Sequence, residues 1–500
     1  MANPGYPIVL TADRTLTARY HLLFDGIVAS EATTAMPGVL AHFLTPRARS
    51  VDGRAARAPL GLRRLEASLL RSGLPVNDLA VVEEAYLGSS IGPKTHVVGV
   101  WVGSPASRGM NAVTVASALG GRPIPRAFFE RLMLRVRELV RDRTQGARVV
   151  LCGPGVWQFS KEQRKSFGFD HVIVGHAEAN APEIFRKLSA GERQPESIEG
   201  ECPKPEDIPS IRGATTMGAI ELSRGCGMNC LFCGSAEESM LHVPDSTIIK
   251  DVRINVKNGQ LNLCLLSEDF FRYGGKEKQA NPAALIELAR GLRTVNEVKL
   301  LQIDHANLCT AAQFTDSELA TVQRLLTGGP KHKFLWVNVG VESASGILLK
   351  NNGCETKLGG CAPRDWAEFS AVQVERLVLA GYFPIVSLMI GLPGESEDDI
   401  IQTTEWINQF RGAQLAVFPM VYKPLNGDRP VDARSLTSLQ WQLIRTCYRL
   451  NFKWMPRLYR DNRRGGGVPL HRSLVGGMAS RAMNMHRRFR LMWNHWQAED

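Results

Sequence analysis

Short apolar segments alternate with amphipathic helical segments along the first 200 residues of the chain. The apolar segments are rich in Val and Ile and lie at residues 8–11, 81–85, 96–102, 149–152 and 171–174. Residues 127–143 place apolar side chains on one face of a helix, and Gly146 follows as a stop signal. Continuous apolar strands that alternate with helices predict a parallel, doubly wound sheet.

The same alternation begins again after a Pro-containing stretch. Predicted strands lie at residues 217–222, 261–266, 298–303, 334–341, 383–390 and 415–418, and predicted helices lie at residues 245–256, 282–292, 316–326 and 365–379. Six strands with crossover helices predict a partial or complete α/β barrel, whose chemistry would lie on the loops that follow the strands. After Pro424 the chain is predicted to form a helix over residues 436–451 and then a basic, Gly-broken end.

These patterns predict an α/β protein with three parts. A Rossmann-like sheet domain is expected over residues 1–200, a linker over 201–213, a barrel over 214–425 and a small helical, basic region over 426–500. A chain of 500 residues is long enough for two or three domains of ordinary size.

Composition narrows the class of protein. Apolar residues make up 44% and charged residues 22% of the chain, which is typical of a globular protein and excludes disordered, collagen-like and disulfide-scaffold chains. The formal charge is +11, and residues 451–500 alone hold 10 Lys and Arg against 3 Asp and Glu. The excess is therefore mostly a property of the C-terminal end, and no nucleic acid is expected as a partner.

The redox compartment decides how the ten cysteines are interpreted. No apolar run approaches the roughly 20 residues that a membrane helix needs, and the N-terminus has no export signal pattern. These observations predict a cytoplasmic protein with reduced thiols, where clustered cysteines are metal ligands rather than disulfides.

The most specific motif is a loop with three cysteines in the spacing CxxxCxxC. Cys226, Cys230 and Cys233 follow the first predicted strand of the second domain. Thiolates are the usual ligands of iron–sulfur clusters, and three of them would leave the fourth iron of a cubane open to a small molecule. The competing readings are a zinc site, which would need a further ligand pair that the sequence does not offer nearby, and three unrelated buried thiols.

This loop resembles the signature of radical S-adenosylmethionine (SAM) enzymes, and further matches follow over about residues 214–420. In that family three cysteines hold a 4Fe–4S cluster, and SAM chelates the open iron. The resemblance implies that Ser267 or Glu268 contacts the methionyl amino group of SAM. It places Glu342 near the ribose and methionyl groups, and Gly391, in a GLPGE segment, on the adenine side.

Glycines also end the predicted strands of the first domain, where a flat cofactor can approach the backbone. They occur as Gly103-Ser104, Gly153-Pro154-Gly155 and a segment running from Gly175 to Glu178. No GxGxxG opens a helix, so a nicotinamide site is disfavoured. Before a radical SAM barrel, this arrangement resembles the cobalamin-binding domain of cobalamin-dependent radical SAM enzymes. The DxHxxG motif that gives a histidine to cobalt is absent. A structural domain without a ligand remains the alternative.

The resemblance implies a C-methyltransferase. A 5′-deoxyadenosyl radical from one SAM would remove a hydrogen from an unactivated carbon, and methylcobalamin, recharged by a second SAM, would deliver the methyl group. The implied cofactors are a 4Fe–4S cluster, SAM and cobalamin. The implied partners are a small-molecule or peptide or protein substrate and an external electron donor.

Other readings stay open at this point. The enzyme could catalyse a cyclisation or rearrangement, the chain could be a non-catalytic iron–sulfur protein, or it could be a zinc-dependent nucleic-acid binder. Cys354 and Cys361 are interpreted as two incidental thiols rather than a second cluster site, and Asp304-His305 as a polar wall of the site. The tail could contact an anionic substrate, a protein or a membrane surface; its basic and aromatic residues include Arg463, Arg464, Arg487, Arg488, Arg490, Trp493 and Trp496.

Overall fold

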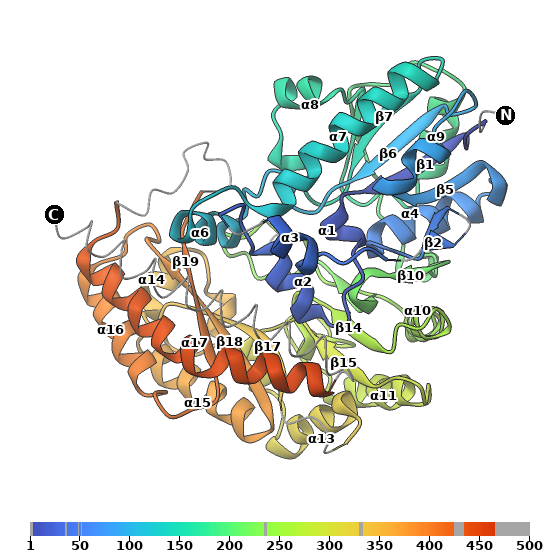
Figure 1. Cartoon of the computed structure of the whole chain (residues 1–500). Helices are drawn as coiled ribbons and strands as arrows, with labels where there is room; N and C mark the ends of the chain where they lie inside the picture. Colours follow the sequence, from blue (N-terminus) through green and yellow to red (C-terminus); the bar gives the residue numbers. More distant parts are fainter. Residues whose placement is uncertain are drawn as a thin grey trace. The chain divides into compact units, whose positions relative to one another are not determined.

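The computed structural model describes residues 4–35, 38–48, 50–51, 53–234, 238–329, 334–424 and 435–465. The chain divides into two compact units, whose elements are labelled in Figure 1. The first unit comprises Met1–Ala112, Gly121–Ile220 and Val243–Gln260, and the second comprises Val113–Gly120, Glu221–His242 and Leu261–Asp500. The chain therefore passes between the units more than once.

A parallel sheet of six strands forms the centre of the first unit. The strands are β1 (Ile8–Ala12), β5 (Leu79–Glu83), β6 (Val97–Trp101), β7 (Arg148–Cys152), β8 (His171–Val174) and β9 (Ser197–Glu199). Their order in space is β5-β1-β6-β7-β8-β9, and each neighbouring pair is parallel. This confirms the predicted parallel α/β sheet, and the order reverses between β1 and β6, which is where open α/β sheets bind ligands.

Helices cover both faces of this sheet because its strands are apolar on both sides. Leu10 and its neighbours on one face pack against α4 (Leu60–Arg71) and α9 (Ala181–Ser189). Val9 and its neighbours on the other face pack against α7 (Ile124–Arg143). Figure 1 shows α7 and α9 on opposite sides of the strands. This double cover explains why the strands read as continuous apolar runs.

Shorter elements complete the first unit. They are α1 (Arg14–Thr17), α2 (Leu23–Ser30), α3 (Gly38–Leu44), β2 (Ser50–Val51), β3 (Arg54–Ala55), β4 (Arg57–Ala58), α5 (Leu87–Ser90), α8 (Lys161–Phe167), β10 (Ala214–Thr215) and α10 (Asp245–Lys257). The helix α10 belongs here although it comes after the cysteine loop in sequence. A buried ion pair between Arg64 Nη2 of α4 and Asp251 Oδ2 of α10, at 2.6 Å, holds it in place.

Parallel strands also organise the second unit. The strands β14 (Asn262–Leu266) and β15 (Leu300–Ile303) pair with each other. A four-stranded parallel sheet follows in chain order, with β16 (His305–Ala306), β17 (Leu335–Glu342), β18 (Tyr382–Ile390) and β19 (Ala416–Val421). The carboxyl ends of these strands are therefore brought to a common side, as in the predicted α/β barrel.

Helices connect and cover these strands. They are α11 (Pro282–Arg293), α12 (Leu308–Ala311), α13 (Asp316–Thr327), α14 (Gly346–Asn351), α15 (Trp366–Leu379), α16 (Glu397–Asn408) and α17 (Ser438–Gly465). The long helix α17 is fixed to β19 by Asn451, whose side chain bonds both the amide and the carbonyl of Val417, at 2.8 and 2.6 Å. Arg463 of α17 is buried against Tyr459, and Arg464 is exposed. Arg487 and the other predicted tail residues after Gly465 lie outside the described residues.

One predicted strand is wrong in its first half. Residues 217–222 were expected to be extended, but Met217 has a φ of 60° inside a short 3-10 turn, Thr216–Gly218. A left-handed backbone cannot continue a strand, so β11 is limited to Ala219–Glu221. The turn lets the Met217 side chain pack against Ala18, Tyr20 and Ala29, which are buried.

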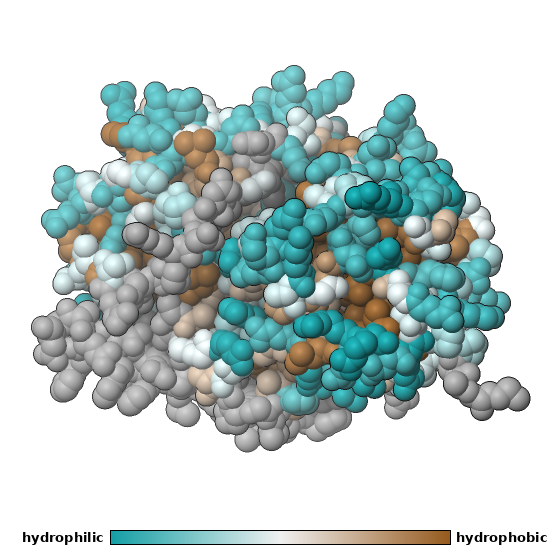
Figure 2. Space-filling model, turned by 90° about the horizontal axis from the view of Figure 1, so that it is seen from above, coloured by the Kyte–Doolittle hydropathy of each residue, from teal (hydrophilic) through white to brown (hydrophobic). Residues whose placement is uncertain are grey.

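The described residues contain no candidate membrane-spanning helix. None of the described helices combines the length and the apolar character needed to cross a membrane. Figure 2 shows hydrophilic residues over much of the described surface on the face drawn, with hydrophobic residues in separate patches between them.

Candidate cofactor site

The three cysteines of the motif lie on the loop of a two-stranded antiparallel ribbon. The strands of the ribbon are β12 (Ser223–Arg224) and β13 (Leu241–His242). None of the three thiols is in a disulfide: Cys230 is buried, and Cys226 and Cys233 are half-buried. The amide of Cys226 donates to Glu238 (2.9 Å) and that of Cys233 to the Cys230 carbonyl (3.0 Å), so the loop is held by its own backbone.

Basic side chains hold the same loop from outside. The Arg272 guanidinium donates to the Cys226 carbonyl, and the Lys278 ammonium donates to the Gly227 carbonyl. Positive charge at the backbone of a thiol-rich loop suits a bound group with net negative charge, as thiolate-ligated iron–sulfur clusters have. Three soft sulfur donors on one loop therefore fit such a cluster.

The thiols differ in how readily they ionise. Burial raises the pKa of Cys226 to about 11, although the nearby Arg272 charge opposes this. At Cys230 the neighbouring Cys354 thiol outweighs burial and lowers the pKa to about 7. Within the described ranges, no three Cys, His, Asp or Glu side chains already stand as the ligands of one metal ion. A cubane instead takes each thiolate on a different iron.

Ser267 and Glu268, the two candidates for contact with the methionyl amino group, have different surroundings at the end of β14. The hydroxyl of Ser267 lies 2.6 Å from that of Ser223 and accepts a hydrogen bond from the Asp269 amide at 3.1 Å. Asp269 is buried and accepts from the Asn307 amide and the Thr310 hydroxyl. Glu268 is exposed between them. Ser267 and Asp269 are thus used by the loop itself, whereas the Glu268 carboxylate can reach a ligand.

An acid–imidazole pair follows β15. His305 Nδ1 lies 3.0 Å from Asp304 Oδ2, and the Asn338 amide donates to Asp304 Oδ1 at 3.3 Å. Burial opposes a charge on the imidazole, but the carboxylates of Asp304, Glu268 and Glu342 outweigh it and raise the pKa of His305 to about 9. A protonated imidazole therefore stands among the acidic strand ends of this unit at neutral pH.

Glu342 ends β17 in an unusual backbone conformation. Its φ is 63°, its side chain pairs with the Lys357 ammonium, and it accepts a hydrogen bond from Ser387 at 3.3 Å. Left-handed backbone at a residue other than glycine stores strain, which is commonest at functional sites. A side chain on Gly340 would collide with this pair, at 2.2 Å from Glu342 Oε1 and 2.4 Å from Lys357 Nζ.

The structure brings the GLPGE segment to the cysteine loop. The Leu231 amide donates to the Asn352 carbonyl at 3.2 Å, and the Asn352 side chain donates to the Pro393 carbonyl at 3.1 Å. Gly391 is exposed, and its amide donates to Glu395 at 3.0 Å. Three segments far apart in the sequence therefore meet in the second unit.

In the first unit, the predicted glycine segments meet at the carboxyl ends of β6 and β7. A side chain on Gly153, whose φ is 107°, would come within 2.5 Å of the Val102 carbonyl, and one on Gly155 within 2.4 Å of the Gly103 carbonyl. The two loops can approach this closely only because both positions are glycine. Ser104 accepts a hydrogen bond from Gln158 at 3.3 Å in the same place.

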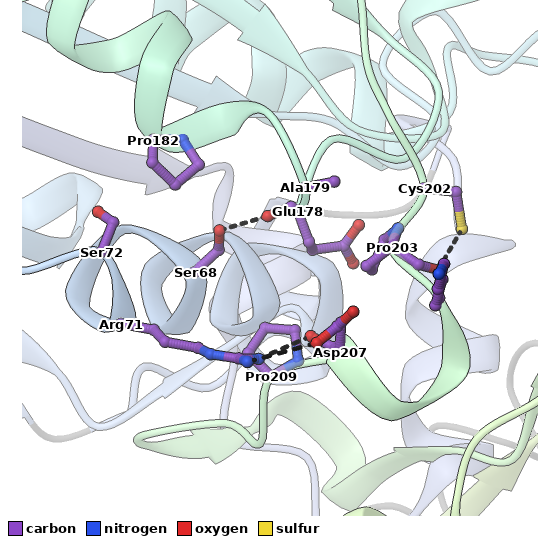
Figure 3. A pocket seen from close by; sticks show the side chains of 11 residues that line it. Ser68, Arg71, Ser72, Glu178, Ala179, Pro182, Cys202, Pro203, Asp207 and Pro209 are labelled. Carbon is purple, nitrogen blue, oxygen red and sulfur yellow. Dashed lines mark hydrogen bonds and ion pairs between the residues drawn. The ribbon is translucent and has the colours of Figure 1, made fainter.

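The segment after β8 lies beside a pocket. Gly175 has a φ of 81° and nothing within 4 Å of the position of a side chain, so its backbone is open to a ligand. Glu178 lines a pocket of about 510 Å³ with residues of α4 and of the 202–209 segment (Figure 3). Ser68 donates to the Glu178 carbonyl at 2.6 Å, and Arg71 and Asp207 pair at the edge of the pocket. Glu178 thus lies in the loop after β8, whereas Gly153 and Gly155 lie in the loop after β7.

Solved structures with this arrangement include a radical S-adenosylmethionine methyltransferase, TsrM from Kitasatospora setae. The form with cobalamin and a [4Fe-4S] cluster bound matches with a TM-score of 0.53, covers 87% of this chain and 80% of that one, and is 15% identical. The form with tryptophan substrate and a SAM analog bound matches with a TM-score of 0.55, covers 87% and 82%, and is also 15% identical.

The chain shares the fold of these TsrM structures.

Curated relatives match a little over half of this chain. The tRNA-2-methylthio-N(6)-dimethylallyladenosine synthase of Nitratiruptor sp. is 20% identical over 291 residues, covering 57% of this chain and 62% of the relative. The threonylcarbamoyladenosine tRNA methylthiotransferase MtaB of Bacillus subtilis is 23% identical over 296 residues, covering 57% and 60%. The ribosomal protein uS12 methylthiotransferase RimO of Trichlorobacter lovleyi is 21% identical over 278 residues, covering 54% and 58%. The chain thus spans about 60% of the length of these relatives. No family model matches it.

Two carboxyl groups of the first unit were missed by reasoning from the sequence. Asp13 and Glu83 follow or end β1 and β5 at the carboxyl edge of the first sheet, and both are buried. Burial raises the pKa of Asp13 to about 6, although Thr15 donates two hydrogen bonds to it. The sequence signal that could have identified them is an acidic residue at the end of an apolar strand, because neighbouring strands and helices bury the end of such a strand.

Glu83 gives a prediction for the pH dependence of stability. Burial raises its pKa from 4.5 to about 7, and among the described residues its Oε1 atom has no hydrogen-bond partner. The folded state therefore binds the proton of the Glu83 carboxyl more tightly than the unfolded state does. Its contribution to stability is full below about pH 4.5 and is lost as the pH rises through about 7.

Glu83→Gln is expected to leave the free energy of unfolding nearly unchanged at pH 5. At pH 8 it should raise that free energy by about 2–3 kcal/mol, since each unit of pKa is worth about 1.4 kcal/mol. Urea unfolding at both pH values measures the effect, with Glu199→Gln on the exposed end of β9 as the control. An equal effect of Glu83→Gln at the two pH values would contradict it.

Proposed function

We propose that the protein is a cobalamin-dependent radical SAM C-methyltransferase. The observation that carries the proposal is the single loop with Cys226, Cys230 and Cys233, whose backbone is held by Arg272 and Lys278, in a chain with the fold of TsrM. When bound, a 4Fe–4S cluster on these thiols would supply the electron that cleaves SAM, and cobalamin would carry the methyl group to the substrate.

The residues of the second unit suggest how SAM is positioned. We assign the methionyl amino group to Glu268, because Ser267 and Asp269 already hold the loop after β14. Although Glu268 is exposed, the surrounding protein removes part of its hydration and raises its pKa, and the ammonium group of SAM would oppose that shift. Glu342, fixed by Lys357 and Ser387, forms a rigid wall beside the site, and the exposed backbone at Gly391 lets the adenine approach.

The first unit supports a cobalamin site. Four of the predicted residues lie at or next to the point where the strand order of the sheet reverses: Gly103, Ser104, Gly153 and Gly155. At Gly175 no other group covers the backbone. A flat corrin can approach backbone that lacks side chains, and the same edge holds polar groups for its amide side chains. Glu178 lines the pocket and would contact the cofactor from that side.

The proposal also includes the class of substrate. The TsrM structure was solved with tryptophan, whereas the curated relatives modify tRNA or a ribosomal protein by methylthio transfer. Because of those relatives, methylthio transfer is the second candidate for this chain. We place a small molecule or a peptide first, since the charge excess belongs mostly to the C-terminal end of the chain.

The test uses the whole chain, purified without oxygen and supplied with iron, sulfide and cobalamin. With dithionite and SAM, we expect 5′-deoxyadenosine and S-adenosylhomocysteine together. SAM with a deuterated methyl group and peptide or amino acid pools should then label a carbon. A product that gains a methylthio group would favour the second candidate. Fewer than about three irons per chain would reject the radical SAM assignment, since a 4Fe–4S cluster needs more. An intact cluster without bound cobalamin would reject only the methyl carrier.

A further inference from the structure

Two side chains of opposite charge follow neighbouring strands of the second unit. The strands β14 and β15 are parallel, and Leu265 lies opposite Ile303 in their register. Glu268 comes shortly after the first of these residues and His305 shortly after the second, and both are exposed. Because neighbouring strands lie about 4.8 Å apart, the two side chains leave the same edge of the sheet close together.

The imidazole of His305 is held through one of its two nitrogens. Its Nδ1 atom lies 3.0 Å from Asp304 Oδ2, and the Asn338 side chain donates to Asp304 Oδ1 at 3.3 Å. The Asn338 amide also donates to the Asp304 carbonyl at 2.9 Å, which fixes the backbone at this point. Within the described ranges, no side chain or backbone group bonds Nε2 of His305. A protonated imidazole held in this way presents its Nε2–H group as a charged donor.

Other cations near these strand ends are already engaged. Lys357 pairs with Glu342, and Arg272 and Lys278 donate to backbone carbonyls of the cysteine loop. His305 differs from them because its partner Asp304 takes Nδ1 and leaves Nε2 for a ligand. The edge therefore offers a carboxylate on Glu268 and a cationic donor on His305, side by side.

A pair of opposite charges at this spacing complements an amino acid zwitterion. The ammonium and carboxylate groups of such a ligand are attached to one carbon, so two neighbouring side chains can bind both, each through a charge-assisted hydrogen bond. We propose that the Nε2–H group of His305 binds the carboxylate of the methionyl group of SAM, beside Glu268 on its amino group. Asp304 is then a positioning residue, which orients the imidazole. The inference rests on the proposed function, which places SAM in this unit.

The experiment uses two probes that differ in one group. S-adenosylhomocysteine has both the amino group and the carboxylate, and decarboxylated S-adenosylhomocysteine lacks only the carboxylate. The dissociation constants of both are measured by titration calorimetry on the full chain, reconstituted with iron, sulfide and cobalamin. The variants are His305→Gln, Asp304→Asn and Glu268→Gln. His171→Gln is the matched control, because His171 bonds the Pro195 carbonyl in the first unit.

His305→Gln is expected to weaken binding of S-adenosylhomocysteine by about 10- to 100-fold, as the loss of a hydrogen bond to a charged group predicts, with iron content retained. Its affinity for the decarboxylated probe should stay at the wild-type value. Asp304→Asn should act in the same direction with a smaller effect, since the imidazole remains. Glu268→Gln should weaken both probes, and His171→Gln should weaken neither.

Three results would overturn the proposal. They are an unchanged affinity for S-adenosylhomocysteine in His305→Gln, an equal loss for the two probes in that variant, and loss of its iron, since His305 would then support the cluster loop. A wild-type chain that binds no iron, or binds iron but neither probe, would instead reject the proposed function.

Discussion

Alanine at Cys226, Cys230 or Cys233 is expected to lower reductive cleavage of SAM by more than about 100-fold, because even changes behind metal ligands cost about 10–100-fold. Each substitution removes one of the three thiols of the loop, and the rest of that loop is held by Arg272 and Lys278 through its backbone. The backbone should therefore stay in place while the cluster is lost. Iron content and 5′-deoxyadenosine formation with dithionite measure the two effects.

The control for these substitutions is Cys361→Ala. Cys361 is a free, half-buried thiol of the same unit and lies against the Ala362 carbonyl. It should leave iron content and SAM cleavage unchanged. If the three loop substitutions kept full iron content, the cluster would lie elsewhere. If all four variants lost iron equally, the loss would reflect general instability.

Asp251→Ala should have the largest effect on stability, lowering the free energy of unfolding by about 3–5 kcal/mol. The carboxylate is fully buried against Arg64, whose side chain is 1% exposed, and it also accepts a hydrogen bond from the Ile211 amide at 3.0 Å. Without Asp251, a guanidinium stays buried with the Pro209 carbonyl, at 2.5 Å, as a neutral partner. Leaving a buried charge uncompensated is what makes the change costly.

Urea and thermal unfolding of the cofactor-free chain measure this effect. Glu130→Ala is the matched control, because Glu130 pairs with Arg122 and Arg126 at the surface, where such pairs are worth about 0–1 kcal/mol. Equal losses in the two variants would contradict the role given to the buried pair.

The strands were predictable because they are buried on both faces. The predicted segment 171–174 coincides with β8, and segment 8–11 differs from β1 by one residue. Their order in the sheet was not predictable, since it depends on which apolar faces the helices cover. The position of α10 was missed for the same reason: its pairing with Arg64 joins residues far apart in the sequence.

In the candidate site, too, some features could be predicted from the sequence and others could not. The cysteine motif is a local spacing, so three candidate ligands could be predicted from one loop. The different surroundings of Ser267 and Glu268 could not be predicted, because they depend on the hydrogen bonds of the Ser267 hydroxyl with Ser223 and Asp269.

The burial of Asp251 also sets an order of events during synthesis. The last strand of the first sheet, β9, ends at Glu199, but the partner of Arg64 is made about fifty residues later. In between, the ribosome releases the whole cysteine loop. Because domains fold as units while the chain emerges, we expect the first unit to stay incomplete until α10 has left the exit tunnel. The thiols of the cluster loop would then appear in the cell before the unit that precedes them is closed.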